Sequence, residues 1–126
     1  MEVGWGAAMA ERTQIIPRDQ WVRFLDDFTR EHQGWRVRIE VTGGARSGVQ
    51  AQDVPLEGVS ADLRGSEQGI SITVGNEQEP GLTHFIPGAR RLVVRRTGAG
   101  NDEALEIEAG DGSRTVLRLQ QVMRAG

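Results

Sequence analysis

The sequence predicts a mainly β fold, α+β only through its single N-terminal helix: a strongly bent antiparallel sheet or small barrel of about seven strands, closed by the helix. Three observations support this prediction. One helical apolar stripe is followed by short segments in which apolar and polar residues alternate. Glycine and proline separate these segments at short intervals. One strand pattern, between residues 49 and 63, contains two bends, which favours a sheet that curls onto itself.

The chain length and the absence of cysteine limit the number of domains and the kinds of chemical site that the chain can form. At 126 residues the chain fits one domain. We expect residues 1–14 to be a disordered tail, residues 15–119 to form one helix-plus-β domain, and residues 120–126 to fray. No segment approaches the ~18 consecutive apolar residues of a membrane span. Without cysteine there are no disulfides or thiolate sites, and a reducing cytoplasm is the expected location.

The helix is predicted from Pro17, which suits a first helical position, to Gly34, which suits the residue after a helix end. His32 falls in the last turn and is expected to be a surface capping residue. The apolar stripe has the spacing i, i+3, i+4, i+7 and consists of Trp21, Phe24, Leu25 and Phe28. We expect this stripe to fill the core of the curved sheet.

The strands begin directly after the helix. Residues 35–42 alternate, with inward positions at Trp35, Val37, Ile39 and Val41. Asp53-Val54-Pro55 must be an edge, a bulge or a corner, because proline removes a ladder donor, and Gly58 permits a second bend. Further strands are expected over residues 70–74, 82–86, 90–96 and 103–109.

The last hairpin allows a register prediction. Asp111-Gly112-Ser113 is taken as the loop, since Asp-Gly is a strong turn signal. The residues that then lie directly opposite each other, with side chains on the same face, are Ile107 and Leu117, Leu105 and Leu119, and Glu106 and Arg118. Glu106 and Arg118 are expected to form an exposed ion pair.

Few residues suggest chemistry, and we predict no catalytic residue, no metal site and no cofactor. No serine lies in a nucleophile elbow. His32 and His84 are far apart and neither has a neighbour at ligand spacing. His84 shares a strand face with Leu82 and Ile86, which favours a core residue, with a role in a pocket as the alternative. The acidic residues 102–108 are expected to form a salt-bridge ladder rather than a cation site.

The arginine cluster is the best candidate for partner or nucleic-acid binding, and it consists of Arg90, Arg91, Arg95 and Arg96. Adjacent strand residues point to opposite faces, so at most two of the four align. A structural ladder with the following acidic strand is the favoured interpretation. The net charge of −3 also argues against non-specific binding along nucleic acid.

Three segments together resemble an uncharacterised bacterial family known as a domain of unknown function, number 5335. They are Ile16–Trp21 (IPRDQW), Pro55–Asp62 (PLEGVSAD) and Asp102–Glu108 (DEALEIE). The similarity covers about Ile15 to Leu119 and implies a free-standing domain but no activity. The helix and the first five strands also resemble the Sm-like RNA-binding barrel in outline. The Asp-x-x-x-Asn loop of that fold is missing, and its Arg-Gly signature appears only as Arg95-Arg96-Thr97-Gly98.

The function predicted from these observations is a non-enzymatic protein-interaction or self-association module, because short strands leave edges that need a partner or protection. The first alternative is an Sm-like nucleic-acid-binding barrel that uses the arginine cluster. The second alternative is a weak enzyme or small-ligand binder around His84. No membrane association is expected.

Overall fold

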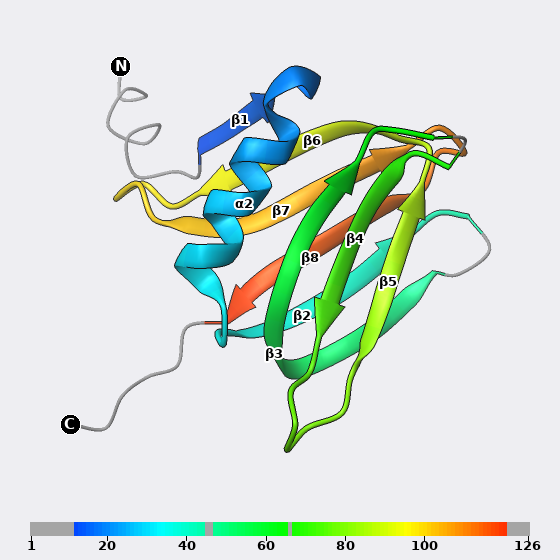
Figure 1. Ribbon diagram of the computed structural model, residues 1–126. Helices are drawn as coiled ribbons and strands as arrows, with labels where there is room; N and C mark the ends of the chain where they lie inside the picture. The colour runs from blue at the N-terminus through cyan, green and yellow to red at the C-terminus, as the bar shows by residue number, and fades with distance from the viewer. Residues whose placement is uncertain (1–11, 45–46, 66, 121–126) are drawn as a thin grey trace.

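The computed structural model describes residues 12–44, 47–65 and 67–120, and shows one α-helix beside an open antiparallel sheet (Figure 1). The eight strands follow the order β1-β6-β7-β8-β2-β3-β4-β5, so β1 and β5 are the two ends. A short 3₁₀ turn, η1 (Arg18–Gln20), precedes α2 (Trp21–His32). The strands are β1 (Arg12–Ile16), β2 (Arg36–Thr42), β3 (Gly48–Asp62), β4 (Gly69–Val74), β5 (Leu82–Pro87), β6 (Ala89–Arg96), β7 (Asp102–Ala109) and β8 (Arg114–Gln120).

The bent sheet with one helix is confirmed, but the sheet does not close into a barrel. The Sm-like outline is therefore wrong: β6 pairs with β1 and β7 instead of closing a five-stranded ring. Strand β1 is not among the strands predicted from the sequence. It pairs with β6 and includes residues 12–14, which were expected to belong to the tail. The remainder of that tail, residues 1–11, and the expected fraying residues 121–126 lie outside the described residues.

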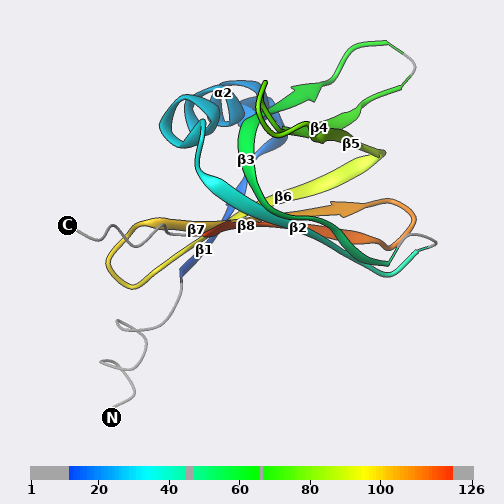
Figure 2. The same ribbon diagram turned by 90° about the horizontal axis from the view of Figure 1, so that it is seen from below.

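The sheet is folded over itself into two layers, which Figure 2 shows edge-on. One layer contains β1, β6, β7, β8 and β2, and the other contains β4, β5 and the second half of β3. Helix α2 lies beside β3 at one side of the space between the layers. The inward side chains of both layers and of the helix form one continuous apolar core.

The bend is located in β3, as the proline and glycine pattern predicts. Residues of β3 up to Pro55 pair with β2, whereas residues from Leu56 onward pair with β4. Asp53 sits at the corner with a φ of 55°, a left-handed conformation that aspartate tolerates better than most residues. A register shift between Leu56 and Gly58 forms the second irregularity. Both bends are local properties of the chain, which explains why they could be predicted.

Helix α2 replaces a strand beside the second half of β3. The Thr29 hydroxyl donates to the Val59 C=O at 3.0 Å and accepts from the Val59 N–H at 2.9 Å. A residue in a strand directs both backbone groups to the same side, so one threonine hydroxyl satisfies both. Gly58 permits this approach, because a Cβ there would lie 3.1 Å from the Thr29 methyl group.

The helical stripe is buried as predicted, with Trp21, Leu25 and Phe28 each at most 2% exposed. The Trp21 indole N–H donates to the Ile16 C=O at 2.8 Å, so its polar atom is satisfied inside the core. Trp35 differs from the prediction, because it is 38% exposed. It precedes β2 in the connection from the helix, and its N–H donates to the His32 C=O rather than to a neighbouring strand.

The predicted register of the last hairpin is wrong by two positions. Gly112 has a φ of 91°, and a positive φ is required at the third position of a three-residue hairpin loop. The loop is therefore Gly110-Asp111-Gly112, and Ala109 N–H donates to the Ser113 C=O across it. A change of two positions keeps every residue on its predicted face. The observed pairs are Leu105 with Leu117, Glu106 with Val116, Ile107 with Thr115, and Glu108 with Arg114.

Candidate functional sites

A pocket of about 400 Å³ lies where end strand β5 approaches the β7–β8 hairpin and the β2–β3 turn. His84 lines it, together with residues of β5 and of the facing hairpin. In the β4–β5 ladder His84 pairs with the buried residue Ile72, and it shares the inner face with Ile86 as predicted. The prediction left open whether His84 is a core residue or a pocket residue, and the structure places this half-buried side chain at the pocket.

The hairpin side of this pocket carries the polar groups. Ser113 donates to the Asp111 carboxylate from its hydroxyl at 2.6 Å and from its backbone N–H at 2.9 Å. These two hydrogen bonds stabilise the charged form, so the pKa of Asp111 lies below the ordinary aspartate range. The buried hydroxyl-bearing residue Thr115 also lines the pocket. The pocket therefore combines an anionic acceptor at its rim with apolar walls.

Strand β5 also has backbone groups that point away from its neighbour β4. Gly88 N–H donates to the Gln68 C=O at 3.0 Å, which identifies this as a hydrogen-bonded pair in the β4–β5 ladder. Such pairs alternate along an antiparallel ladder, so the N–H and C=O groups of Thr83 and Phe85 point away from β4. Pro87 occupies the next outward position, where no N–H is needed. Since β5 ends the sheet, no other strand pairs with this edge in the part of the chain described, although β7 lies close to β5.

The arginine cluster does not form one continuous surface. Arg95 forms an ion pair with Glu106, and Arg96 binds Asp102 at 2.9 Å, so both are matched with acids of β7. Arg90 and Arg91 are exposed near the start of β6. The division runs along the strand, because Arg95 and Arg96 at its end both bind acids of β7, and it favours the structural ladder over a nucleic-acid surface.

The acidic residues of β7 form the salt-bridge ladder that was predicted. Glu106 pairs with Arg95, and Glu108 pairs with Arg114 at 3.1 Å. The expected Glu106–Arg118 pair is wrong, because the changed hairpin register brings Val116 opposite Glu106. Arg118 instead contacts Glu40 of β2 at 3.2 Å.

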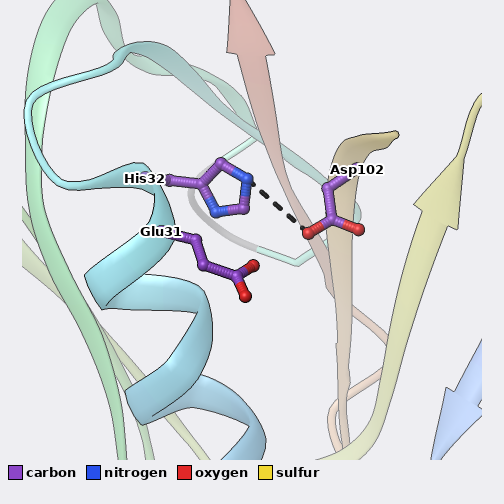
Figure 3. A group of neighbouring side chains, drawn as sticks. All are labelled: Glu31, His32 and Asp102. Atoms are coloured by element: carbon purple, nitrogen blue, oxygen red, sulfur yellow. Dashed lines mark ion pairs between the residues drawn. The ribbon is translucent and has the colours of Figure 1, made fainter. Parts of the chain in front are cut away.

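A second group of side chains meets at the end of helix α2, as Figure 3 shows. Glu31 and His32 come from the last turn of α2, and Asp102 begins β7. One ligand atom of each lies within 4.8 Å of the others. These residues line a pocket of about 460 Å³ together with Arg96, Trp35 and the β6–β7 turn. His32 is 5% exposed, so the expected surface location is wrong.

Aromatic packing buries the His32 ring in this position. The ring contacts Phe28 with centroids 4.3 Å apart and forms a T-shaped contact with Trp35, with centroids 4.7 Å apart. Its Nδ1 atom lies 2.9 Å from the Phe28 C=O, and its Nε2 atom lies 3.6 Å from Asp102 Oδ2. The sequence prediction overlooked this group because it considered only the spacing of the two histidines. No local sequence pattern connects His32 with Asp102, because Asp102 reaches this place through the β6–β7 turn.

In the residues that the structure describes, the fold and these two pockets define a small domain with an open, bent antiparallel sheet and one α-helix. The family model of DUF5335, a family of unknown function, matches residues 12–125. The chain belongs to this family, as the three segments in the sequence indicate. No curated protein and no solved structure shows significant similarity to the chain. Within the described residues, no helix is sufficiently long and apolar to cross a membrane.

Proposed function

We propose that this domain is a protein-interaction module that binds an extended segment of a partner along the free edge of β5. One observation supports the proposal above all others: the sheet is open, and its end strand β5 borders a pocket of about 400 Å³. Peptides bind such edges as an additional strand, with backbone hydrogen bonds for affinity and side-chain pockets for specificity. Both features occur together at β5.

The pocket indicates what the bound segment carries. Asp111 is ionised at neutral pH and partly saturated by Ser113, which leaves acceptor capacity for a donor from outside. A basic side chain of the partner matches this rim, and its aliphatic part matches the apolar walls. We therefore propose an extended partner segment with an arginine or lysine whose side chain points toward the pocket.

The test is a selection of random heptapeptides displayed on phage, followed by fluorescence polarisation with the selected peptides. The Thr83→Pro variant removes one outward N–H of β5 without removing a hydrogen bond to β4. Since this variant also loses the hydroxyl contact between Thr73 and Thr83, 3.1 Å long, Thr73→Ala is its matched control. We expect Thr83→Pro and Asp111→Asn to weaken binding at least tenfold and Thr73→Ala to leave it unchanged.

Failure to enrich any basic peptide, or equal binding by Thr83→Pro and Thr73→Ala, would contradict the proposal. Far-UV circular dichroism checks that each variant is folded. Self-association is the second form of the same proposal, since β5 of one copy can pair with β5 of another about a two-fold axis. Light scattering at micromolar concentration then shows a dimer, which Thr83→Pro converts to a monomer.

Nucleic-acid binding through Arg90, Arg91, Arg95 and Arg96 is the alternative function. The pairing of Arg95 and Arg96 with acids opposes it. A salt-dependent shift on single-stranded RNA that Arg90→Ala plus Arg91→Ala abolishes would support it. We also propose a bacterial origin, which the resemblance noted in the sequence implies, and a cytoplasmic location, which the cysteine-free composition favours.

A further inference from the structure

The hydrogen bond of His32 shows which ring nitrogen donates to the backbone. A carbonyl oxygen accepts and never donates, so the Nδ1 atom that lies 2.9 Å from the Phe28 C=O carries the proton. In the neutral ring the Nε2 atom then has a lone pair, and this lone pair faces Asp102. A metal ion between these two acceptors would bind both of them.

The separation of the two atoms fits a metal ion. The Nε2 atom and Asp102 Oδ2 are 3.6 Å apart, which is longer than a normal hydrogen bond. Two ligands that each lie about 2.1 Å from a tetrahedral Zn²⁺ are about 3.4 Å apart. Glu31 supplies the third donor, with its ligand atom within 4.8 Å of the others, and it is exposed.

The surrounding groups orient these ligands as outer contacts do in metal sites. The Phe28 C=O accepts a hydrogen bond from Nδ1 and so holds the His32 ring. A backbone carbonyl is a usual partner of a metal-binding imidazole. The Arg96 guanidinium binds Asp102 Oδ1 at 2.9 Å and leaves Oδ2 directed to His32. The Arg96 side chain in turn donates to Gln14 at 2.6 Å. The two carboxylates together balance the charge of a divalent ion. When no ion is bound, the Arg96 guanidinium offsets part of their negative charge.

We propose that Glu31, His32 and Asp102 bind one divalent transition-metal ion, with Zn²⁺ as the best match. An imidazole with two carboxylates is a donor set that suits such ions better than Ca²⁺ or Mg²⁺, which prefer oxygen ligands alone. Three protein ligands leave a fourth position, which faces the pocket of about 460 Å³. A water molecule or an anionic ligand would complete the coordination there. This site is independent of the β5 edge.

The first test is isothermal titration of the metal-free, untagged protein with Zn²⁺ at pH 7.5. We expect one ion per chain with a Kd of 10 μM or tighter. Glu31→Gln should weaken binding at least tenfold and leave the fold unchanged, because Glu31 is exposed. Asp26→Asn, an exposed change on the same helix, is the matched control and should bind as the parent does. Asp102→Asn should abolish binding, and circular dichroism checks that this variant is folded.

The second test identifies the ligand atom by ¹⁵N NMR of the two histidine rings. Zn²⁺ should shift the His32 Nε2 resonance, retain the proton on Nδ1 and leave the His84 ring unchanged. Three results would overturn the proposal: no binding tighter than 100 μM, equal affinity in Glu31→Gln and Asp26→Asn, or a Zn²⁺-dependent shift confined to His84. Any of these would mean that Glu31, His32 and Asp102 do not form a Zn²⁺ site.

Discussion

Arg36 of β2 binds Glu79 of the β4–β5 loop through two hydrogen bonds, of 2.8 and 3.0 Å. The same guanidinium donates to the Asp53 carboxylate at 2.9 Å, at the corner of β3. One side chain therefore connects the two layers of the sheet at the bend. The bidentate geometry restricts orientation as well as distance, which is a property of arginine that lysine lacks.

This connection makes the stability depend on pH. The hydrogen bonds from Arg36 lower the pKa of Glu79 in the folded protein. A carboxylate with a lowered pKa stabilises the fold above its unfolded pKa, and this contribution is lost as the pH falls through the folded pKa. We expect acidification below about pH 4.5 to reduce the urea midpoint of the parent more than that of Glu79→Gln. Equal pH profiles in urea titrations would show that the contact contributes nothing.

Trp21 provides the second prediction. Because the side chain is 1% exposed and its indole N–H is satisfied, Trp21→Ala should cost about 3–5 kcal/mol in the free energy of unfolding. Val22→Ala changes the adjacent residue, which is 48% exposed, and should cost less than about 1 kcal/mol. Chemical denaturation measures both. A loss below 1 kcal/mol for Trp21→Ala would mean that the helix is peripheral to the core.

Thr29 provides the third prediction, because it tests whether the helix replaces a strand. Thr29→Val keeps the shape but leaves the Val59 N–H and C=O without their partner. We expect a loss of about 1–3 kcal/mol, since both backbone groups are partly buried. Thr29→Ser retains the hydroxyl and should recover most of that loss. Hydrogen exchange at the Val59 amide gives a local measurement, and unchanged protection in Thr29→Val would contradict the assigned bond.

Two glycines provide the fourth prediction. A Cβ at Gly81 would lie 2.0 Å from the Val74 backbone oxygen, so Gly81→Ala must move the backbone at the start of β5. At Gly110 the nearest atom is the flexible Arg90 side chain, at 3.4 Å, which can move away. We expect Gly81→Ala to lower the melting temperature strongly and Gly110→Ala to change it little. The opposite order in a thermal scan would contradict this packing of the β4–β5 loop.

Local patterns predicted the parts of the fold that depend on neighbouring residues. The helical stripe and the strand alternation correctly predicted buried side chains, namely Trp21, Leu25 and Phe28 in the helix and Val37 and Ile39 in β2. These outcomes require only that each element turn its apolar side inward. The hairpin at Asp111 shows the limit of this approach. Its faces were correct but its register was not, because registers that differ by two positions place the same side chains inward.

By itself, therefore, the sequence determined the helix after Pro17, the bend of the sheet at Asp53, and the family membership. Only the tertiary structure decided that the sheet stays open, that β5 is an end strand, and that Asp102 meets His32. The physical reason is that the order of strands depends on contacts between distant segments, which no periodicity encodes. Both proposed sites lie where such segments meet, so the function depends on the part that the sequence leaves undetermined.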